Sequence, residues 1–350
     1  MERTRLGRTE LKVSRIGFGA LQIAAKYDYA HAERLLNLAL DSGINLLDTA
    51  HGYPDSEQRI GRAISHRREE FFIATKSGGH TRKGFREALE ESLRRLRTDH
   101  VDIYQFHGAE TGSEEYIFRG ETTIECMREA QEQGKIRFTG FSSHSLEGSL
   151  NHARSQAFDV LQYPVSYVGD EAAERGLVEE AARLDVGFLG MKPFGGGRLG
   201  KARYCLGYVF QFPTLVPVIG FETEAELREA VQLAETGVEL TEADRAEMAS
   251  VKAELGERFC RGCNYCHPCP QGIPVLSVMF FDVYRKQFGD DWVAREEYQR
   301  DIEAVSRCEE CRQCVERCPF DLDIPAIMRE IVARYKRMAE ARKAGTSGQG

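Results

Sequence analysis

The chain repeats one pattern eight times, and this repetition restricts its fold more than any other feature of the sequence. Each apolar run of strand length is followed by a stretch with apolar residues three and four positions apart, the spacing of an amphipathic helix. The runs end near Ala20, Asp48, Lys76, His107, Ser143, Gln162, Lys192 and Gly220. Asp48 and Lys76 are 28 residues apart, and Lys76 and His107 are 31 apart, about the length of one strand and one helix. Eight such units predict a (β/α)8 TIM barrel.

The segments between the runs predict the helices that cover this barrel. We expect helices over residues 30–42, 82–96, 122–133 and 171–184. The alternative is an open, doubly wound sheet, whose first strand and helix are joined by G-x-G-x-x-G. Gly17 and Gly19 begin such a motif, but Gln22 stands where its third glycine belongs. The sequence therefore favours the closed barrel.

The charge balance limits which partners the protein can have. Lys and Arg number 47 against 55 Asp and Glu, which gives a net charge of −8. An acidic chain lacks the positive field that nucleic acids and anionic membranes require. It also has no run of 18 apolar residues and no apolar stretch near its start. We therefore expect a cytoplasmic protein without nucleic-acid or membrane partners, whose cysteines are not paired as disulfides.

Polar residues occupy the ends of three successive predicted strands. Asp48, Lys76 and His107 are those terminal residues, and Tyr53 follows Asp48 by five positions. Each of the three strand-end residues also has an ordinary structural interpretation: Asp48 as a helix cap or turn residue, Lys76 as a solvated strand end and His107 as a core histidine. In a parallel barrel, however, these strand ends share one face. There the Tyr53 hydroxyl could protonate a reduced carbonyl, the Lys76 ammonium would lower the pKa of that hydroxyl, and Asp48 would hold Lys76 in place.

Six segments of the chain resemble the signatures of the aldo-keto reductase superfamily, in the same order. They are LGRTELKVSRIGFGA, GINLLDTAHGYPDSEQRIGRAI, FFIATKSG, VDIYQFHG, GKIRFTGFSSHS and VLQYPVSY. The resemblance covers residues 4 to about 235 and implies a (β/α)8 barrel enzyme that uses NADPH or NADH. It places the catalytic tetrad on Asp48, Tyr53, Lys76 and His107, with Tyr53 as general acid and base. The substrate would be a small carbonyl compound or alcohol.

The same resemblance implies residues that bind the nicotinamide cofactor. Ser142, Ser143 and Gln162 would hold its carboxamide, although the family more often has Asn where this chain has Ser143. Met191 stands where the family often stacks an aromatic ring on the nicotinamide. The remaining residues expected along the cofactor are Gly19, Lys192 and Gly195, the last of these beginning a glycine run.

A group of glutamates follows the eighth predicted strand, where the family usually offers Lys or Arg to the 2′-phosphate of NADPH. Glu222, Glu224 and Glu226 would repel that phosphate and could accept a hydrogen bond from the 2′-hydroxyl of NADH. NADH is therefore a plausible cofactor. The alternative is that these residues only complement the N-terminal dipole of the next helix.

Eight of the ten cysteines fall into two motifs near the C-terminus. Cys260, Cys263, Cys266 and Cys269 form C-x2-C-x2-C-x2-C-P, and Cys308, Cys311, Cys314 and Cys318 form C-x2-C-x2-C-x3-C-P. The second is the bacterial ferredoxin motif, and together the motifs predict two [4Fe-4S] clusters. Zinc is the alternative, because C-x2-C pairs also form four-cysteine zinc sites. Cys126 and Cys205 lie in helical stretches and are expected to be core residues.

The segment between the motifs reads as helical, and the region resembles α-helical ferredoxin domains of respiratory and heterodisulfide-type enzymes. That resemblance implies that each cluster takes its fourth cysteine from the other motif. One cluster would then use Cys260, Cys263, Cys266 and Cys318, and the other Cys308, Cys311, Cys314 and Cys269. The x2 spacing before Cys269 departs from the usual x3.

These features divide the chain and leave its function partly open. We expect a barrel over 1–240, a helical linker over 241–256, a dicluster ferredoxin-like domain over 257–337 and a disordered tail over 338–350. The protein would be an NAD(P)H-dependent oxidoreductase whose clusters exchange electrons with a one-electron carrier such as a ferredoxin. Alternatively the clusters are structural or redox-sensing, or the barrel is a non-catalytic electron-transfer module.

Overall fold

The computed structural model describes residues 1–24, 27–78, 81–118 and 123–346, which divide into two compact units. Unit 1 contains Met1–Gly195 and Leu199–Ala249, and unit 2 contains Gly196–Arg198 and Ser250–Gly350. The division at Ala249 falls inside a helix of the segment that the sequence analysis called a linker. Each unit is described separately below.

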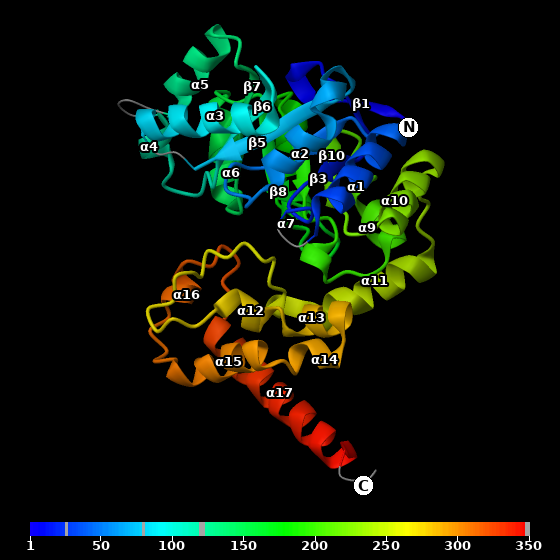
Figure 1. Ribbon diagram of the computed structural model, residues 1–350, viewed down its shortest axis with the longest axis vertical. Coiled ribbons are helices and arrows are strands. Elements are labelled where there is room, and N and C mark those ends of the chain that lie inside the picture. The colour runs from blue at the N-terminus through cyan, green and yellow to red at the C-terminus, as the bar shows by residue number, and fades with distance from the viewer. Residues whose placement is uncertain (25–26, 79–80, 119–122, 347–350) are drawn as a thin grey trace. The chain divides into compact units, whose positions relative to one another are not determined.

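Unit 1 is a closed barrel of eight parallel strands in the order β10-β3-β4-β5-β6-β7-β8-β9 (Figure 1). This confirms the predicted fold class and is incompatible with the open-sheet alternative. The barrel strands are β3 (Gly17–Gly19), β4 (Leu46–Asp48), β5 (Phe72–Ser77), β6 (Val101–His107), β7 (Ile136–Ser142), β8 (Val160–Pro164), β9 (Gly187–Met191) and β10 (Leu215–Gly220).

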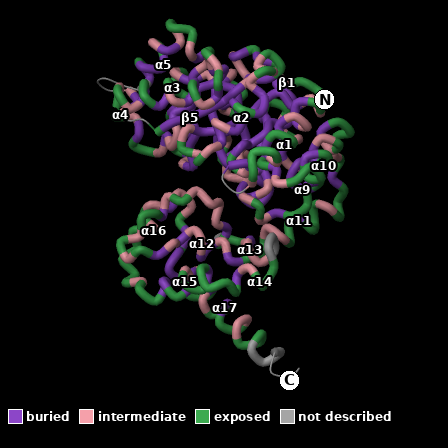
Figure 2. Tube along the Cα trace, viewed as in Figure 1, coloured by how far each residue is buried: buried purple, intermediate pink, exposed green. Residues whose placement is uncertain are grey.

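Helices follow the strands and cover the outside of the barrel. They are α1 (Tyr29–Asp41), α2 (Ser56–Ile64), α3 (Arg82–Leu96), α4 (Glu114–Phe118), α5 (Thr123–Glu132), α6 (Leu146–Ser155), α7 (Glu171–Glu174), α8 (Leu177–Arg183), α9 (Ala202–Val209) and α10 (Glu224–Thr236). Helix α11 (Glu242–Leu255) follows α10 and crosses the division between the two units. The helix expected over 171–184 is divided into α7 and α8 at Gly176, whose φ of 78° lies in the left-handed region that helices do not use. In Figure 2 the barrel strands run mostly through buried, purple segments.

A hairpin before the barrel closes its N-terminal end. Strands β1 (Arg3–Arg5) and β2 (Lys12–Ser14) pair antiparallel, an element that the sequence analysis did not predict. Leu6, Leu11 and Val13 from this hairpin join the apolar residues of the barrel interior in one buried cluster. The bottom of the barrel is therefore filled, and the polar strand ends lie at the opposite, C-terminal end.

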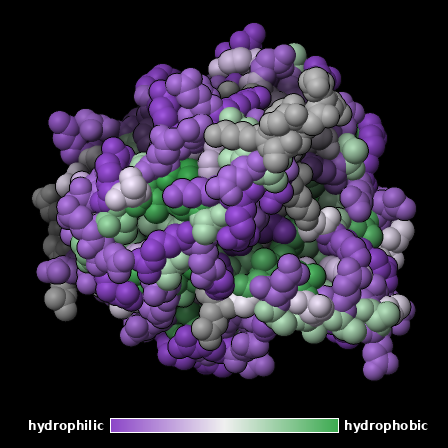
Figure 3. Space-filling view, turned by 90° about the horizontal axis from the view of Figure 1, so that it is seen from below, coloured by the Kyte–Doolittle hydropathy of each residue, from purple (hydrophilic) through white to green (hydrophobic). Residues whose placement is uncertain are grey.

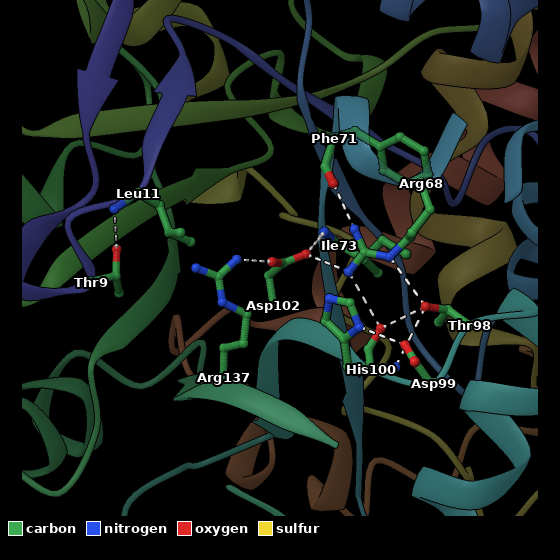
Figure 4. Close-up of polar contacts among 10 residues, drawn as sticks. All are labelled: Thr9, Leu11, Arg68, Phe71, Ile73, Thr98, Asp99, His100, Asp102 and Arg137. Carbon is green, nitrogen blue, oxygen red and sulfur yellow. Dashed lines mark hydrogen bonds and ion pairs between the residues drawn. The ribbon is translucent and has the colours of Figure 1, made fainter. Parts of the chain in front are cut away.

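A buried carboxylate ties three segments together near the start of β6. Asp102 is 1% exposed and accepts hydrogen bonds from Arg68 at 2.7 Å, from Arg137 at 2.6 Å and from the backbone of Ile73 at 2.9 Å (Figure 4). Because Asp102 stands at the N-terminal end of its strand, this network supports the barrel at the end away from the predicted tetrad.

Unit 2 is helical where the structure describes its regular elements. Its α-helices are α12 (Val275–Met279), α13 (Phe281–Phe288), α14 (Asp290–Val293), α15 (Glu296–Ala304), α16 (Gln313–Glu316) and α17 (Ile324–Thr346). The helical reading of the segment between the cysteine motifs agrees with α12 to α15. Helix α17 includes residues 338–346, for which the sequence analysis expected disorder. Ala, Arg, Lys and Glu dominate this stretch and favour helix.

Charged residues make up 29% of the chain. On the face drawn in Figure 3, hydrophilic side chains cover most of the area and apolar residues appear in small patches between them. None of the helices in the described ranges is long and apolar enough to cross a membrane.

Candidate active site and iron–sulfur centre

The strand register brings the predicted site residues to one end of the barrel. His107, the last residue of β6, pairs with Ser142 of β7, and Ser142 pairs with Gln162 of β8. Asp48 ends β4, and Lys76 is the penultimate residue of β5. Residues 114 positions apart in sequence thus meet at the C-terminal mouth of the barrel.

Asp48 and Lys76 form a buried ion pair at this mouth. The Lys76 Nζ atom lies 2.8 Å from each carboxylate oxygen of Asp48, and it also donates to the carbonyl of Thr49 at 2.9 Å. Lys76 is 2% exposed and Asp48 is 4% exposed. An ammonium has three donors, so these contacts use all of them and fix the side chain.

Tyr53 lies beside this pair on the loop that follows β4. Its backbone donates to the carbonyl of Ala50 at 3.0 Å, which forms a tight turn. The Lys76 Nζ atom lies 5.5 Å from the centre of the Tyr53 ring. The Tyr53 and His107 rings meet edge to face, with centroids 6.3 Å apart. All four members of the predicted tetrad therefore lie together.

The site changes the pKa values of three of these groups. Burial raises the pKa of Tyr53, and the nearby Lys76 ammonium only partly offsets this effect. The net direction is opposite to the lowering that the sequence analysis expected. Burial also lowers the pKa of His107, to about 4, with Lys76 and Lys192 acting in the same direction. Burial disfavours the charged form of Lys76, but Asp48 and Tyr53 outweigh it and raise the pKa of Lys76.

At neutral pH these directions assign a charge state to each side chain. Tyr53 carries its proton and can donate it, while His107 is neutral and can donate a hydrogen bond without holding a charge. Lys76 remains an ammonium. The arrangement suits the stabilisation of negative charge on an oxygen placed between Tyr53 and His107.

The residues predicted to hold a nicotinamide carboxamide differ in whether they already have a hydrogen-bond partner within the protein. The Gln162 Oε1 atom is buried and has no hydrogen-bond partner, and Ser142, its neighbour across the strands, is also buried. A buried amide oxygen without a donor is energetically costly, so it fits a ligand that supplies an N–H group. The Ser143 hydroxyl instead donates to Glu110 at 3.0 Å.

Glu226 and Glu224 both have structural partners in α10. Glu226 forms a capping box with Thr223: its Oε2 atom accepts from the backbone of Glu222 at 2.8 Å and of Thr223 at 3.1 Å. Glu224 lies 3.6 Å from Arg228 one turn along the helix. The carboxylate of Glu222 accepts from the Tyr27 hydroxyl at 3.0 Å.

The other predicted cofactor residues lie at strand ends or in the glycine run. Gly19 ends β3, and a Cβ there would lie 3.2 Å from Val218. Met191 ends β9, and Lys192 follows it with a φ of 56°. Gly195, with a φ of 58°, also adopts the left-handed conformation.

Two polar residues of this mouth were missed by the sequence analysis. Glu110 accepts from the backbone of His144 at 2.9 Å and of Ser145 at 2.6 Å, at the start of α6. His144 is 8% exposed, and its Nε2 atom lies 3.2 Å from the Lys192 Nζ atom. The sequence analysis located Asp48, Lys76 and His107 because they end predicted strands. Glu110 and His144 do not end strands, so this signal could not find them.

The cysteines of unit 2 form two neighbourhoods that combine both motifs. Burial raises the pKa of Cys266 to about 12, and Cys260, Cys263 and Cys318 add to this effect as nearby thiolates. A sulfur from the second motif therefore lies near three from the first. Cys266 and Cys318 are also part of the apolar core of unit 2.

The second neighbourhood combines three cysteines of the second motif with one of the first. One small cavity is lined by Cys308, Cys311, Cys314 and Cys269, together with Ile273, Val275 and Met328. Burial raises the pKa of Cys314, and Cys308 and Cys269 contribute to the shift. Four thiols around an apolar cavity fit a cluster with one iron per thiolate. In the described residues, no three His, Cys, Asp or Glu side chains converge to hold a single metal ion.

The sequence of each unit matches a known family model. Residues 15–212, more than half of the chain, match the aldo/keto reductase family. Residues 259–323 match a 4Fe-4S dicluster domain. The two matches cover the tetrad and all eight clustered cysteines.

Individual proteins resemble part of the chain. An uncharacterised oxidoreductase, YqkF of Bacillus subtilis, is 34% identical over 157 residues, which are 41% of this chain and 49% of that protein. The 6-dehydroglucose reductase of Novosphingobium aromaticivorans is 29% identical over 215 residues, 55% of this chain and 69% of that protein. The chain thus spans about half to two thirds of the length of these relatives. Among solved structures, PA4992 of Pseudomonas aeruginosa, described as an aldo-keto reductase, superposes with a TM-score of 0.60 at 28% identity, covering 67% of this chain and 95% of that one.

Proposed function

Because the chain belongs to the aldo/keto reductase family, whose members are NAD(P)H-dependent oxidoreductases, we propose that it interconverts a carbonyl compound and an alcohol at the barrel mouth. The observation that carries this proposal is the buried Asp48–Lys76 ion pair beside Tyr53 and His107. Two charges are costly to remove from water, and groups with shifted pKa values cluster at functional sites, so this buried pair beside a tyrosine supports a catalytic role.

Each tetrad residue has a distinct part in the proposed reaction. The Tyr53 hydroxyl gives its proton to the carbonyl oxygen during reduction and takes one from the alcohol during oxidation. The Lys76 ammonium stabilises the phenolate that Tyr53 becomes after donating. Neutral His107 donates a hydrogen bond to the same substrate oxygen, and Asp48 holds Lys76 in position.

The nicotinamide supplies or accepts the hydride when it is bound. Gln162 and Ser142 are the residues proposed to hold its carboxamide, because the Gln162 oxygen is buried and lacks a donor. The Ser143 hydroxyl already donates its proton to Glu110, so only its oxygen could accept a hydrogen bond from the carboxamide. Glu222 is the residue of the acidic loop that we propose favours NADH, because Glu226 serves as a helix cap.

The C-terminal unit is proposed to hold two [4Fe-4S] clusters. Cys260, Cys263, Cys266 and Cys318 would ligate one, and Cys308, Cys311, Cys314 and Cys269 the other. The mixed neighbourhoods of Cys266 and Cys314 support this exchange of the fourth ligand. Each cluster would carry one electron at a time, so two clusters would match in number the two electrons of one hydride and would exchange electrons singly with a carrier such as a ferredoxin.

A second role for the clusters is favoured by the core of unit 2. Cys266 and Cys318 pack among buried residues that include Val278, Phe281 and Met328. Ligation there would hold the helices together in the way that structural metals stabilise small domains. In that case the clusters maintain or sense the state of the unit, and the barrel works as a conventional reductase.

The proposed chemistry is tested by Tyr53→Phe in the anaerobically purified full chain. This change removes the proton donor and leaves the ring, so kcat for aldehyde reduction should fall by about 10²- to 10⁴-fold. Nucleotide affinity, measured by fluorescence titration, should stay nearly constant. Tyr29→Phe, on the exposed face of α1, is the matched control. An unchanged kcat in Tyr53→Phe would exclude Tyr53 as the acid.

A further inference from the structure

Lys192 places a second ammonium at the barrel mouth, in addition to Lys76. It follows the last residue of β9 and has a φ of 56°, a conformation that is strained for a residue with a side chain. Its carbonyl accepts from the backbone of Gly195 at 2.8 Å, which holds this turn. The fold thus keeps a lysine in a position where glycine would be favoured.

His144 orients the Lys192 side chain. The two nitrogens, Lys192 Nζ and His144 Nε2, are 3.2 Å apart. An ammonium only donates, so Nε2 must accept and the His144 ring carries its proton on Nδ1. The Nδ1 atom lies 3.9 Å from Glu110. Burial and the Lys192 charge both lower the pKa of His144, so the ring stays neutral.

The Lys192 ammonium acts on the tetrad as well as on His144. It is one of the charges that lower the pKa of His107, after burial and Lys76. Lys76 itself has no donor left for a substrate, because Asp48 and Thr49 use all three. Of the two described lysines whose charge acts on His107, Lys192 is therefore the one considered for contact with a bound substrate.

We infer that Lys192 selects carbonyl substrates that carry a carboxylate, with His144 as the residue that positions it. This inference rests on the proposed carbonyl chemistry, and it gives Lys192 a contact with the substrate in place of the cofactor contact that the family resemblance implies. The substrate oxygen would lie against Tyr53 and His107, and the carboxylate would accept charge-assisted hydrogen bonds from Lys192. A carboxylate would meet the Lys192 charge in a partly buried setting, where such contacts are stronger than in water.

The test compares pairs of aldehydes that differ mainly in the carboxylate. Succinic semialdehyde is paired with butanal, and glyoxylate with glycolaldehyde, so that the carboxylate stands at two distances from the carbonyl. The measured quantity is the ratio of kcat/KM for the acid to kcat/KM for its neutral partner. The holoprotein should prefer the acid in at least one pair. Lys192→Met should lower that ratio by about 10- to 100-fold, and Lys192→Arg should retain most of it.

Two further variants separate this role from general effects. Lys201→Met removes an exposed lysine that pairs with Glu247, and its ratio should match that of the unmodified protein. His144→Leu should lower the ratio less than Lys192→Met, because the charge remains but is no longer oriented. A mere loss of stability would not change the ratio.

The outcomes distinguish this inference from the proposed function. Reduction of butanal or glycolaldehyde without a preference for either acid overturns the carboxylate site and leaves the proposed function standing. A Lys192→Met variant with a raised KM for the nucleotide and an unchanged ratio assigns Lys192 to the cofactor instead, which also overturns the inference. If none of the four aldehydes is reduced, the proposed function fails, and the inference fails with it.

Discussion

The Nζ atom of Lys76 lies 2.8 Å from both carboxylate oxygens of Asp48, and this pair is almost completely removed from solvent. The two charges stand on adjacent strands, β4 and β5, which fixes their separation through the sheet. Removing one partner would leave the other as an uncompensated buried charge. We therefore expect changes to this ion pair to affect both the stability of the protein and the proposed catalysis.

We expect Asp48→Ala to lower the free energy of unfolding by about 3 to 5 kcal/mol, the usual cost of breaking a buried pair. The double variant Asp48→Ala with Lys76→Met should recover part of this loss, because no unpaired charge remains. Urea unfolding of the full chain measures the loss in Asp48→Ala, in Lys76→Met and in the double variant. A double variant whose loss equals the sum of the single losses would show that the two charges do not interact. Aldehyde reduction should be strongly impaired in all three proteins.

The low pKa of His107 predicts a stability difference at acid pH. The native imidazole binds a proton only near pH 4, whereas the unfolded one binds it near 6.5. Between these values the unfolded state holds more protons, so the stability contributed by neutral His107 is lost as the pH falls from about 6.5 to 4. His107→Gln should lose less stability over this interval than the unmodified protein.

This pH prediction has a matched control in the exposed His66. His66→Gln should follow the unmodified protein from pH 6.5 to 4, as measured by urea unfolding at each pH. Equal acid sensitivity in His107→Gln and the unmodified protein would contradict a neutral, buried His107.

The tetrad could be located from sequence because its members follow a rule of parallel barrels. Three of them stand at or next to strand ends, and those ends converge regardless of distance along the chain. Glu110 and His144 follow no such rule. Their contacts with the β7–α6 turn and with Lys192 depend on how loops pack, which periodicity does not encode.

The sign of the Tyr53 pKa shift also required the structure. The sequence indicated a lysine near the hydroxyl but not the extent of burial around it, and burial is the larger effect. Similarly, the sequence left open whether the acidic loop selects the cofactor or only complements the dipole of the next helix. Only the hydrogen bonds show that Glu226 caps α10, whereas Glu222 bonds Tyr27.

Cluster ligation predicts a pattern among double cysteine variants. Cys266→Ala with Cys318→Ala changes two ligands of one proposed cluster, so about four irons should be lost. Cys266→Ala with Cys269→Ala changes one ligand of each, and about eight irons should be lost. Iron and sulfide analysis with EPR of the reduced protein measures both. Cys205→Ala, at a buried position of α9 in the barrel unit, is the control. Stoichiometric zinc without labile sulfide would contradict the cluster proposal.

Nucleotide preference should depend on Glu222. NADH should bind more tightly than NADPH, and Glu222→Lys should reverse the order by offering a cation to the 2′-phosphate. Glu224→Lys is the control, because Glu224 pairs with Arg228 within α10. Glu226→Arg should mainly destabilise the helix, by about 0.5 to 2 kcal/mol, through loss of the cap. Tighter binding of NADPH to the unmodified protein would refute the preference.

A single proposed cluster ligand can test whether hydride transfer at the barrel is linked to electron transfer through the clusters. Cys314 lines the cavity with Cys269, Cys308 and Cys311, and it lies outside the barrel unit. If the clusters carry electrons, Cys314→Ser should abolish NAD(P)H-dependent reduction of a viologen dye while aldehyde reduction survives, because hydride transfer uses only the tetrad.

If the clusters are structural, loss of one should destabilise unit 2 and lower its melting temperature, and both activities should fall together. Loss of dye reduction alone, in a protein that melts at the unmodified temperature, would establish electron transfer. Retention of both activities would contradict both roles for that cluster.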